Sequence, residues 1–206
     1  MPRQARIIYP GFFYHVLNRG NGKRIIFHKK QDYEMFINLM IKATVRFPLK
    51  IFSYCLMPNH FHLVVSPDKY DKLANWMHWL MTVYAKRYHF YHNTTGHLWQ
   101  SRYKSFVIEN DRHLFTVIRY VEGNPVRAGL VPSAKDWKWS SHRFNLGILT
   151  SSCENSFIPS RLPFPIPKDW GLFVDTPLLK KDLLNLRKCL RSNLPFGERQ
   201  WMKIES

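Results

Sequence analysis

Two histidines with one residue between them are the first feature of this sequence that could do chemistry. His60 and His62 follow Pro58-Asn59 and begin a run of strand-forming residues that ends at Val65. Because successive side chains of a strand alternate between its faces, the two imidazoles point the same way, about 7 Å apart. Such a pair can share one metal ion, although two half-buried strand histidines with hydrogen-bonded rings are the commoner form of His-x-His.

A tyrosine and an asparagine further along could complete the same site. Tyr120 and Asn124 are four residues apart, so they lie on one side of a predicted helix, flanking its apolar stripe. With His60 and His62, the Asn124 amide oxygen would form a mixed ligand set that suits Mg²⁺ or Mn²⁺ better than Zn²⁺, because it contains no thiolate. A divalent cation beside a phosphodiester would allow the Tyr120 hydroxyl to attack phosphorus and form a phosphotyrosine ester. Alternatively, Tyr120 is an interfacial core residue and Asn124 a helix cap.

The charge of the chain indicates a polyanionic partner. The 206 residues include 31 lysines and arginines against 14 acidic residues, which gives a net charge of +17 and a pI near 10.0. An excess of this size is typical of nucleic-acid-binding proteins. No apolar run of 18 residues occurs, so we expect no membrane association. The N-terminal run, broken by Pro10-Gly11, is unlike a signal peptide, and three widely spaced cysteines favour the cytoplasm.

The elements that must position these residues follow the order of an α+β protein. Strand-forming runs cover 12–19, 50–56, 60–65 and 105–109, and helical spacing begins near Asp32, after Pro67 and at Asn110-Asp111, where a helix continues to Pro125. This order predicts a ferredoxin-like antiparallel sheet with its helices packed on one face. The short Pro58-Asn59 connection predicts a hairpin, which could make the histidine strand central.

We expect the chain to divide into a folded domain, residues 1–145, which would hold the candidate catalytic residues, and a C-terminal extension, residues 146–206. Five prolines interrupt residues 145–177, which predicts an extended linker or wrapping arm. A last amphipathic helix follows, with leucines from Leu179 to Leu190 opposite basic residues. We expect this helix to dock on the body of the protein or on nucleic acid.

Basic and aromatic residues alternate between His97 and Lys104. Cations that hold phosphates beside rings that stack on bases suit single-stranded nucleic acid; the alternative is a solvated basic loop pinned by a packed Trp99. His15, in the first strand, could face the same site as the histidine pair, although an ordinary strand histidine is the simpler interpretation. The candidate DNA contacts are Arg19, Trp99, Arg102, Tyr103, Lys104 and Arg127.

Three stretches together resemble the REP-associated tyrosine transposases, which belong to the single-tyrosine HUH transposase superfamily. They are Met57–Val65, His97–Lys104 and Arg119–Val131, in a resemblance that covers roughly residues 5 to 145. The resemblance implies that His60, His62 and Asn124 are metal ligands and that Tyr120 is the nucleophile. It also implies nicking and joining of single-stranded DNA next to short hairpins, with a 5′-phosphotyrosine intermediate and a free 3′-hydroxyl.

The resemblance implies single-stranded DNA with hairpin elements as the partner of a monomer or dimer. One departure is Gly123, a position where the family more often carries a bulkier residue. Glycine in the last helical turn costs about 1 kcal/mol of helix stability and could loosen Tyr120.

Two other functions fit the same residues. One is a non-catalytic protein of this fold that binds single-stranded or hairpin nucleic acid. The other is a metal-dependent hydrolase with a water nucleophile, for which Glu109 or Glu122 would supply the carboxylate.

Overall fold

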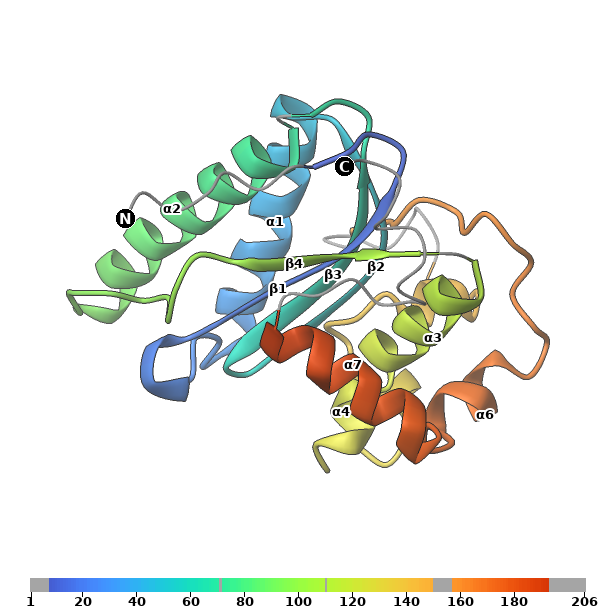
Figure 1. The fold of residues 1–206 in the computed structure, drawn as a ribbon. Coiled ribbons are helices and arrows are strands. Elements are labelled where there is room, and N and C mark those ends of the chain that lie inside the picture. The colour runs from blue at the N-terminus through green and yellow to red at the C-terminus, as the bar shows by residue number, and fades with distance from the viewer. Residues whose placement is uncertain (1–7, 71, 110, 150–156, 193–206) are drawn as a thin grey trace.

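A four-stranded antiparallel sheet forms the centre of the computed structural model, which describes residues 8–70, 72–109, 111–149 and 157–192 (Figure 1). The strands lie in the spatial order β2-β3-β1-β4. Their bounds are Phe13–Arg19 for β1, Leu49–Met57 for β2, His60–Pro67 for β3 and Lys104–Ile108 for β4. All four predicted strands are confirmed. The predicted hairpin is confirmed too, because Met57 pairs with His60 across Pro58-Asn59, and β3 is central beside β1.

Helices α1 (Lys30–Arg46) and α2 (Lys72–His92) cover one face of the sheet. The odd-numbered residues of β3, such as Phe61 and Leu63, belong to the core beneath them, and so does Val16 of β1. The even-numbered residues of β3 therefore face the other way, and this places His60 and His62 on the opposite face. A short 3-10 turn, η1 (Asn21–Lys23), follows β1.

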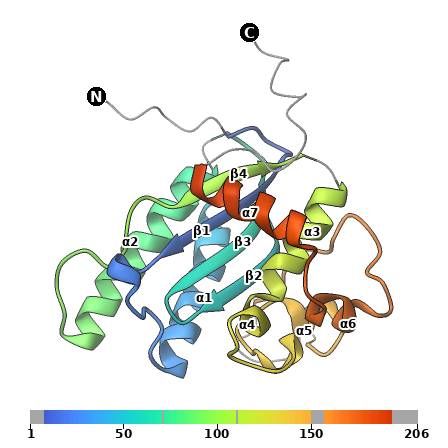
Figure 2. The ribbon, with the colours of Figure 1, turned by 60° about the horizontal axis from the view of Figure 1, so that its bottom comes forward.

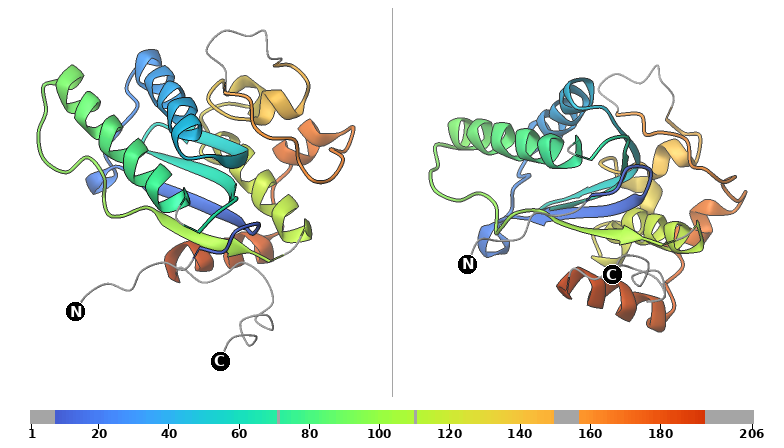
Figure 3. Two further views of the ribbon diagram at one scale, coloured as in Figure 1. Left: turned by 90° about the horizontal axis from the view of Figure 1, so that it is seen from above. Right: turned by 45° about the horizontal axis from the view of Figure 1, so that its top comes forward.

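The opposite face carries α3 (Asp111–Glu122) and the elements that follow it (Figure 3). They are α4 (Asn124–Arg127), the 3-10 turn η2 (Ala134–Asp136), α5 (His142–Asn145), α6 (Trp170–Asp175) and α7 (Lys180–Ser192). The ferredoxin-like α+β class is confirmed, and α1 and α2 share one face as expected. The placement of α3 differs from the prediction, because its apolar stripe, with Leu114 and Val117, packs against Phe52 and Val64 on the second face.

The helix that carries Tyr120 ends earlier than the sequence predicts. Helix α3 stops at Glu122, and Asn124 begins the separate turn α4. Pro125 has no backbone N–H, so it cannot bond the carbonyl of Val121 four residues before it, and the continuous helix is interrupted there. The Gly123 N–H still donates to the Arg119 carbonyl, which keeps the two turns close to a common course.

The described part of the extension packs on α3 rather than standing apart as a linker (Figure 2). Ser160 donates its N–H to the Ile51 carbonyl at the β2 edge, and α6 contacts both α3 and η2. The predicted last helix is α7, which lies against β4 and buries Leu186, whereas Leu179 is exposed. Residues 193–206 and the side chain of Leu190 lie outside the described structure. Within the described residues, no helix has the length and apolar character needed to span a membrane.

A buried carboxylate fastens the end of α3 to its surroundings. Glu122 is fully buried, and its Oε1 accepts hydrogen bonds from Ser141 Oγ at 2.8 Å and Asn145 Nδ2 at 2.6 Å. Its Oε2 lies 2.9 Å from His142 Nδ1 and accepts from Trp170 Nε1 at 2.9 Å. A buried ionised carboxylate is stable only when such donors replace water. The group therefore ties α3 to α5 and α6.

We expect Glu122→Gln to lower the free energy of unfolding by about 2–4 kcal/mol. Whichever way the new amide is oriented, its NH₂ group meets an N–H that can only donate, either from Asn145 or from Trp170. Urea unfolding followed by circular dichroism measures this loss. Glu34→Gln is the control, because Glu34 forms only a surface pair with Lys30. A Glu122→Gln protein as stable as the Glu34→Gln protein would contradict this account of the network.

Candidate active site

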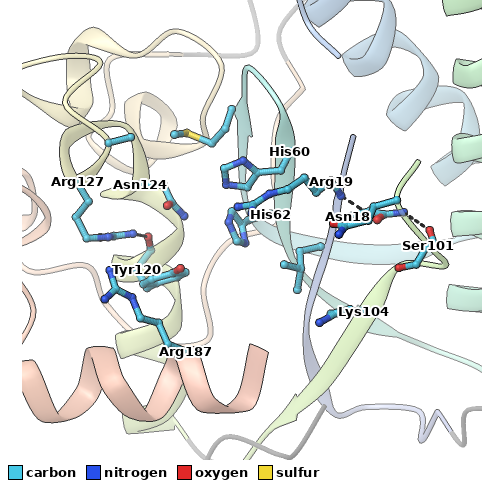
Figure 4. Close-up of a pocket in the computed structure, with 14 residues that line it drawn as sticks. Asn18, Arg19, His60, His62, Ser101, Lys104, Tyr120, Asn124, Arg127 and Arg187 are labelled. Atoms are coloured by element: carbon cyan, nitrogen blue, oxygen red, sulfur yellow. Dashed lines mark hydrogen bonds between the residues drawn. The ribbon is translucent and has the colours of Figure 1, made fainter. Parts of the chain in front are cut away.

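A cavity of about 500 Å³ lies on the α3 face of the sheet, where β1 and β3 meet α3, α4 and α7 (Figure 4). Seven of the residues selected from the sequence line it, from segments spread over more than a hundred residues. They are Arg19, His60, His62, Lys104, Tyr120, Asn124 and Arg127. The structure thus brings the candidate metal ligands, the candidate nucleophile and three basic side chains into one space.

The two histidines of β3 stand side by side, each held at one ring nitrogen. Their ring centroids are 5.0 Å apart and their planes nearly perpendicular. His60 Nδ1 lies 2.6 Å from Asn59 Oδ1, and His62 Nδ1 lies 2.8 Å from His15 Nε2. Because an amide oxygen only accepts, His60 Nδ1 carries the hydrogen and His60 Nε2 keeps a lone pair. Neither Nε2 has a hydrogen-bond partner among the described residues.

Burial keeps these imidazoles uncharged. It lowers the pKa of His60 to about 3, with the Arg19 guanidinium as a second cause, and it lowers the pKa of His15 to about 3. The pKa of His62 also lies well below its usual value, first because of burial and then because of the neighbouring His15. Neutral imidazole is the form that binds a metal ion, so near neutral pH no proton has to leave.

Tyr120 lies beside the histidines and beneath a guanidinium. Its ring centroid is 5.7 Å from that of His62, and the Arg127 guanidinium stands 4.3 Å above the ring and donates to the Tyr120 carbonyl. Burial raises the pKa of the Tyr120 phenol, while Arg127, Arg187 and Arg19 oppose this rise. Tyr120 is therefore a phenol at neutral pH, and three positive charges are placed to stabilise its phenolate.

The side-chain amide of Asn124 is buried beside the cavity, with one atom unpartnered in the described part of the chain. Its side chain is 9% exposed, and its Nδ2 is buried with no hydrogen-bond partner in the described structure. A buried amide N–H without an acceptor is costly, so this atom would suit an oxygen of a bound phosphate rather than a metal ion. Among the described residues no three His, Cys, Asp or Glu side chains form a metal cluster. The cavity side chains that could hold a metal ion are therefore His60 and His62, through imidazole nitrogens, and Asn124, through its amide oxygen.

Three predicted DNA contacts lie outside this cavity. Trp99, Arg102 and Tyr103 belong to the loop 96–103 and line a second groove, which lies between this loop and α2. The Trp99 indole donates to the Met81 carbonyl at 3.0 Å and packs edge-on against Phe61, so this ring pins the loop, as the alternative reading of the segment expected.

Several residues of the cavity wall were not selected from the sequence. They are Asn18, Gln100, Ser101 and Arg187. His15, for which the sequence left open a place on this face, lies behind His62, and its Nε2 is 2.8 Å from His62 Nδ1. Strand alternation gives the only signal for His15, because odd-numbered residues of β1 share the face of the histidine pair. Arg187 is one of several basic residues on α7, and no local pattern distinguishes it.

No carboxylate from the described residues lines the cavity. Glu122 belongs to the buried network behind α3, and Glu109 lies 3.4 Å from His113. Neither is placed to activate a water molecule beside the histidines, which removes the structural basis of the hydrolase alternative.

Gly123 makes room for the residues around Tyr120. A Cβ at this position would lie 2.9 Å from Arg127 Nη1 and 2.9 Å from the Val174 carbonyl oxygen. The second atom belongs to the backbone of α6 and cannot move alone. The concern that glycine loosens Tyr120 is therefore not supported, because the absent side chain is what allows Arg127 and α6 to pack closely against α3.

Comparison with known proteins shows which family this chain matches. The family model "Transposase IS200 like" matches residues 9–124, a segment that ends at Asn124 and includes all four candidate catalytic and metal-binding residues. A protein of Haemophilus influenzae Rd named "Putative REP-associated tyrosine transposase" is 30% identical over 108 residues. The match covers 47% of this chain and 61% of that relative, so it spans less than two thirds of the relative's length.

A solved structure with the same fold supports the architecture. A REP-associated tyrosine transposase bound to a REP hairpin aligns with a TM-score of 0.60 and 19% identity, over 79% of this chain and 99% of that one. A "putative transposase" from Deinococcus radiodurans R1 aligns with a TM-score of 0.42 and 16% identity, over 59% of this chain and 96% of that one. The first likeness supports the fold assignment, and the second is too distant to support an argument.

We expect Gly123→Ala to lower the free energy of unfolding by about 1–3 kcal/mol, because the added methyl group overpacks the contact with α6. Gly171→Ala is the matched control: its Cβ would meet only Leu146, at 3.5 Å or more, and alanine favours the helix α6. Thermal unfolding of both variants measures the difference. Equal midpoints for the two proteins would show that close packing at Gly123 is unimportant.

Proposed function

The chain belongs to the IS200-like transposase family, and we propose that it is a metal-dependent transesterase that cleaves and rejoins single-stranded DNA next to short hairpins. The observation that carries this proposal is the meeting of Tyr120 with His60, His62 and Asn124 in one cavity. A net charge of +17 supports a nucleic-acid partner. The relative solved with a REP hairpin supports hairpin DNA in particular.

The reaction that fits this cavity is a single in-line exchange at phosphorus. The Tyr120 hydroxyl loses its proton and its oxygen attacks the phosphorus of the bound phosphodiester. The new bond joins Tyr120 to phosphorus, and the bond from phosphorus to the 3′ oxygen breaks. The leaving oxygen takes up a proton, which leaves a free 3′-hydroxyl and a 5′-phosphotyrosine. The same steps in reverse, with an incoming 3′-hydroxyl, rejoin the DNA.

The basic residues of the cavity would hold the phosphate and favour the phenolate. Arg127 and Arg187 approach Tyr120 from two different helices, and Arg19 approaches from β1 (Figure 4). Positive charges fixed before the reaction stabilise negative charge that develops on the phosphate and on the phenol oxygen. A divalent cation held by the Nε2 atoms of His60 and His62 and by Asn124 would supply Lewis-acid polarisation of the phosphodiester when bound.

We expect Tyr120→Phe to abolish the covalent protein–DNA adduct and leave DNA affinity within about threefold, because only the attacking oxygen is removed. Denaturing gel electrophoresis with labelled single-stranded hairpin DNA and Mn²⁺ or EDTA detects the adduct. Tyr70→Phe, at an exposed tyrosine, is the control and should form adducts like the wild type.

The other possible outcomes of this experiment would each indicate a different function. Cleaved DNA without an adduct, unchanged in Tyr120→Phe, would indicate a hydrolase with a water nucleophile. Salt-sensitive binding without cleavage, over several hairpin sequences, would indicate a non-catalytic DNA-binding protein.

The hydrogen bond with His15 determines whether His62 Nε2 has a free lone pair or carries a hydrogen. The hydrogen between His15 Nε2 and His62 Nδ1 can reside on either atom. When His62 carries it, His62 Nε2 can bind a cation; when His15 carries it, His62 Nε2 bears a hydrogen and cannot. His15 Nδ1 is buried without a hydrogen-bond partner among the described residues, so no second hydrogen bond there sets which nitrogen of His15 carries its proton. His15 therefore acts as a positioning residue for the proposed metal site.

We expect His15→Phe to weaken Mn²⁺ binding about 10- to 100-fold, because phenylalanine fills the space but cannot accept the His62 hydrogen bond. Isothermal titration calorimetry of the DNA-free protein measures the affinity, and circular dichroism checks the fold. His97→Phe removes an exposed imidazole and controls for non-specific binding of Mn²⁺. Unchanged affinity in a folded His15→Phe protein would show that His15 does not support the site.

A further inference from the structure

A second hollow lies beside the catalytic cavity. It is a groove of about 690 Å³ between α2 and the loop 96–103, within the size range of ligand sites in proteins. No carboxylate of the described residues lines it, and five of its lining residues have basic or imidazole side chains. These five are His78, Lys86, His89, His97 and Arg102. The charge of the groove therefore suits an anionic ligand.

The groove and the cavity share one wall. Asn18 lines the cavity, and its Nδ2 donates to the Ser101 carbonyl at 2.9 Å and lies 3.6 Å from Met81 Sδ, which lines the groove. Figure 4 shows Asn18 and Ser101 on the side of the cavity opposite Tyr120. Neighbouring residues of one loop point to different sides, with Gln100 and Ser101 on the cavity and Arg102 on the groove. A DNA strand that leaves the cavity here would meet the groove next.

The chemistry of the groove fits unpaired nucleotides. The partly exposed Met81 and Trp99 give it an apolar floor, and its lining residues Lys86 and Arg102 are exposed. Apolar and aromatic surface accepts the face of a base, and exposed cations accept the phosphates that follow. His89 adds a buried Nε2 without a hydrogen-bond partner among the described residues, while its Nδ1 bonds Thr94 Oγ1 at 2.8 Å. That nitrogen is available to a polar edge of a base.

We propose that this groove binds unpaired nucleotides of the substrate strand that flank the scissile phosphate. The inference rests on the proposed function and extends it, because the protein would then hold more of the strand than the catalytic cavity contains. The bases would lie against the floor of the groove and the phosphates against its cations. Duplex DNA cannot present unstacked base faces, so the groove would distinguish single-stranded flanks from double-stranded ones.

The test compares two hairpin oligonucleotides, one with the cleavage site alone and one extended by about six unpaired nucleotides at either end. Fluorescence anisotropy measures affinity, and adduct formation on the short oligonucleotide measures chemistry. Lys86→Glu reverses a charge at the groove, and Lys42→Glu makes the same change at an exposed lysine of α1.

We expect the wild type to bind one extended oligonucleotide at least about tenfold tighter than the short one, and Lys86→Glu to lose most of that gain. For the short oligonucleotide, the Lys86→Glu and Lys42→Glu proteins should have the same affinity. Cross-linking from 5-iodouracil in the extension should reach residues 97–103 or the groove face of α2.

Three results would overturn the proposal: no gain from either extension, an equal loss in Lys42→Glu, or the same gain when the extension is made double-stranded. Failure of the proposed function is a separate observation, namely that the wild-type protein forms no adduct with the short oligonucleotide.

Discussion

The end of α3, which carries Tyr120, is held by one buried carboxyl group. Glu122 lies two residues after Tyr120 and two before Asn124. Five hydrogen-bonding groups from β2, α5, α6 and the residue before α5 surround its carboxylate. Loss of a hydrogen-bond partner is costly for a carboxyl group this deeply buried, so it fixes the end of α3 against elements far along the chain. Gly123 then lets Arg127 and α6 approach closely. Tyr120, the proposed nucleophile, is thus positioned by a network that does not touch the cavity.

The two faces of the sheet have different roles. The α1 and α2 face is an apolar core, whereas the α3 face mixes an apolar cluster with a polar hollow at the ends of β1 and β3. Histidines buried on that second face are costly unless their ring nitrogens are bonded, and Asn59 and His15 each bond one. Both contacts leave an Nε2 beside the cavity. The cost of burying the imidazoles is reduced by the same bonds that orient them.

Local patterns in the sequence predicted the strands, their hairpin and seven residues of the cavity. His60 and His62 follow from strand alternation, and Tyr120 with Asn124 from helical spacing, even though Pro125 breaks the helix between them. Amphipathic spacing shows that α3 packs against the sheet, but it does not show which face of the sheet α3 covers. The partner of His15 depends on strand register, and the close approach of Val174 to Gly123 joins residues about fifty positions apart. Arg187 reaches the cavity through the docking of α7, which no local pattern encodes.

The most direct test of the central claim is mass spectrometry of the protein after reaction with single-stranded hairpin DNA and Mn²⁺. Proteolysis and nuclease trimming would show which residue carries DNA and through which end. The account predicts a nucleotide esterified through its 5′-phosphate to the peptide that contains Tyr120, together with a released strand that ends in a 3′-hydroxyl. Cleaved DNA with no modified peptide, or an adduct on another residue, would contradict it.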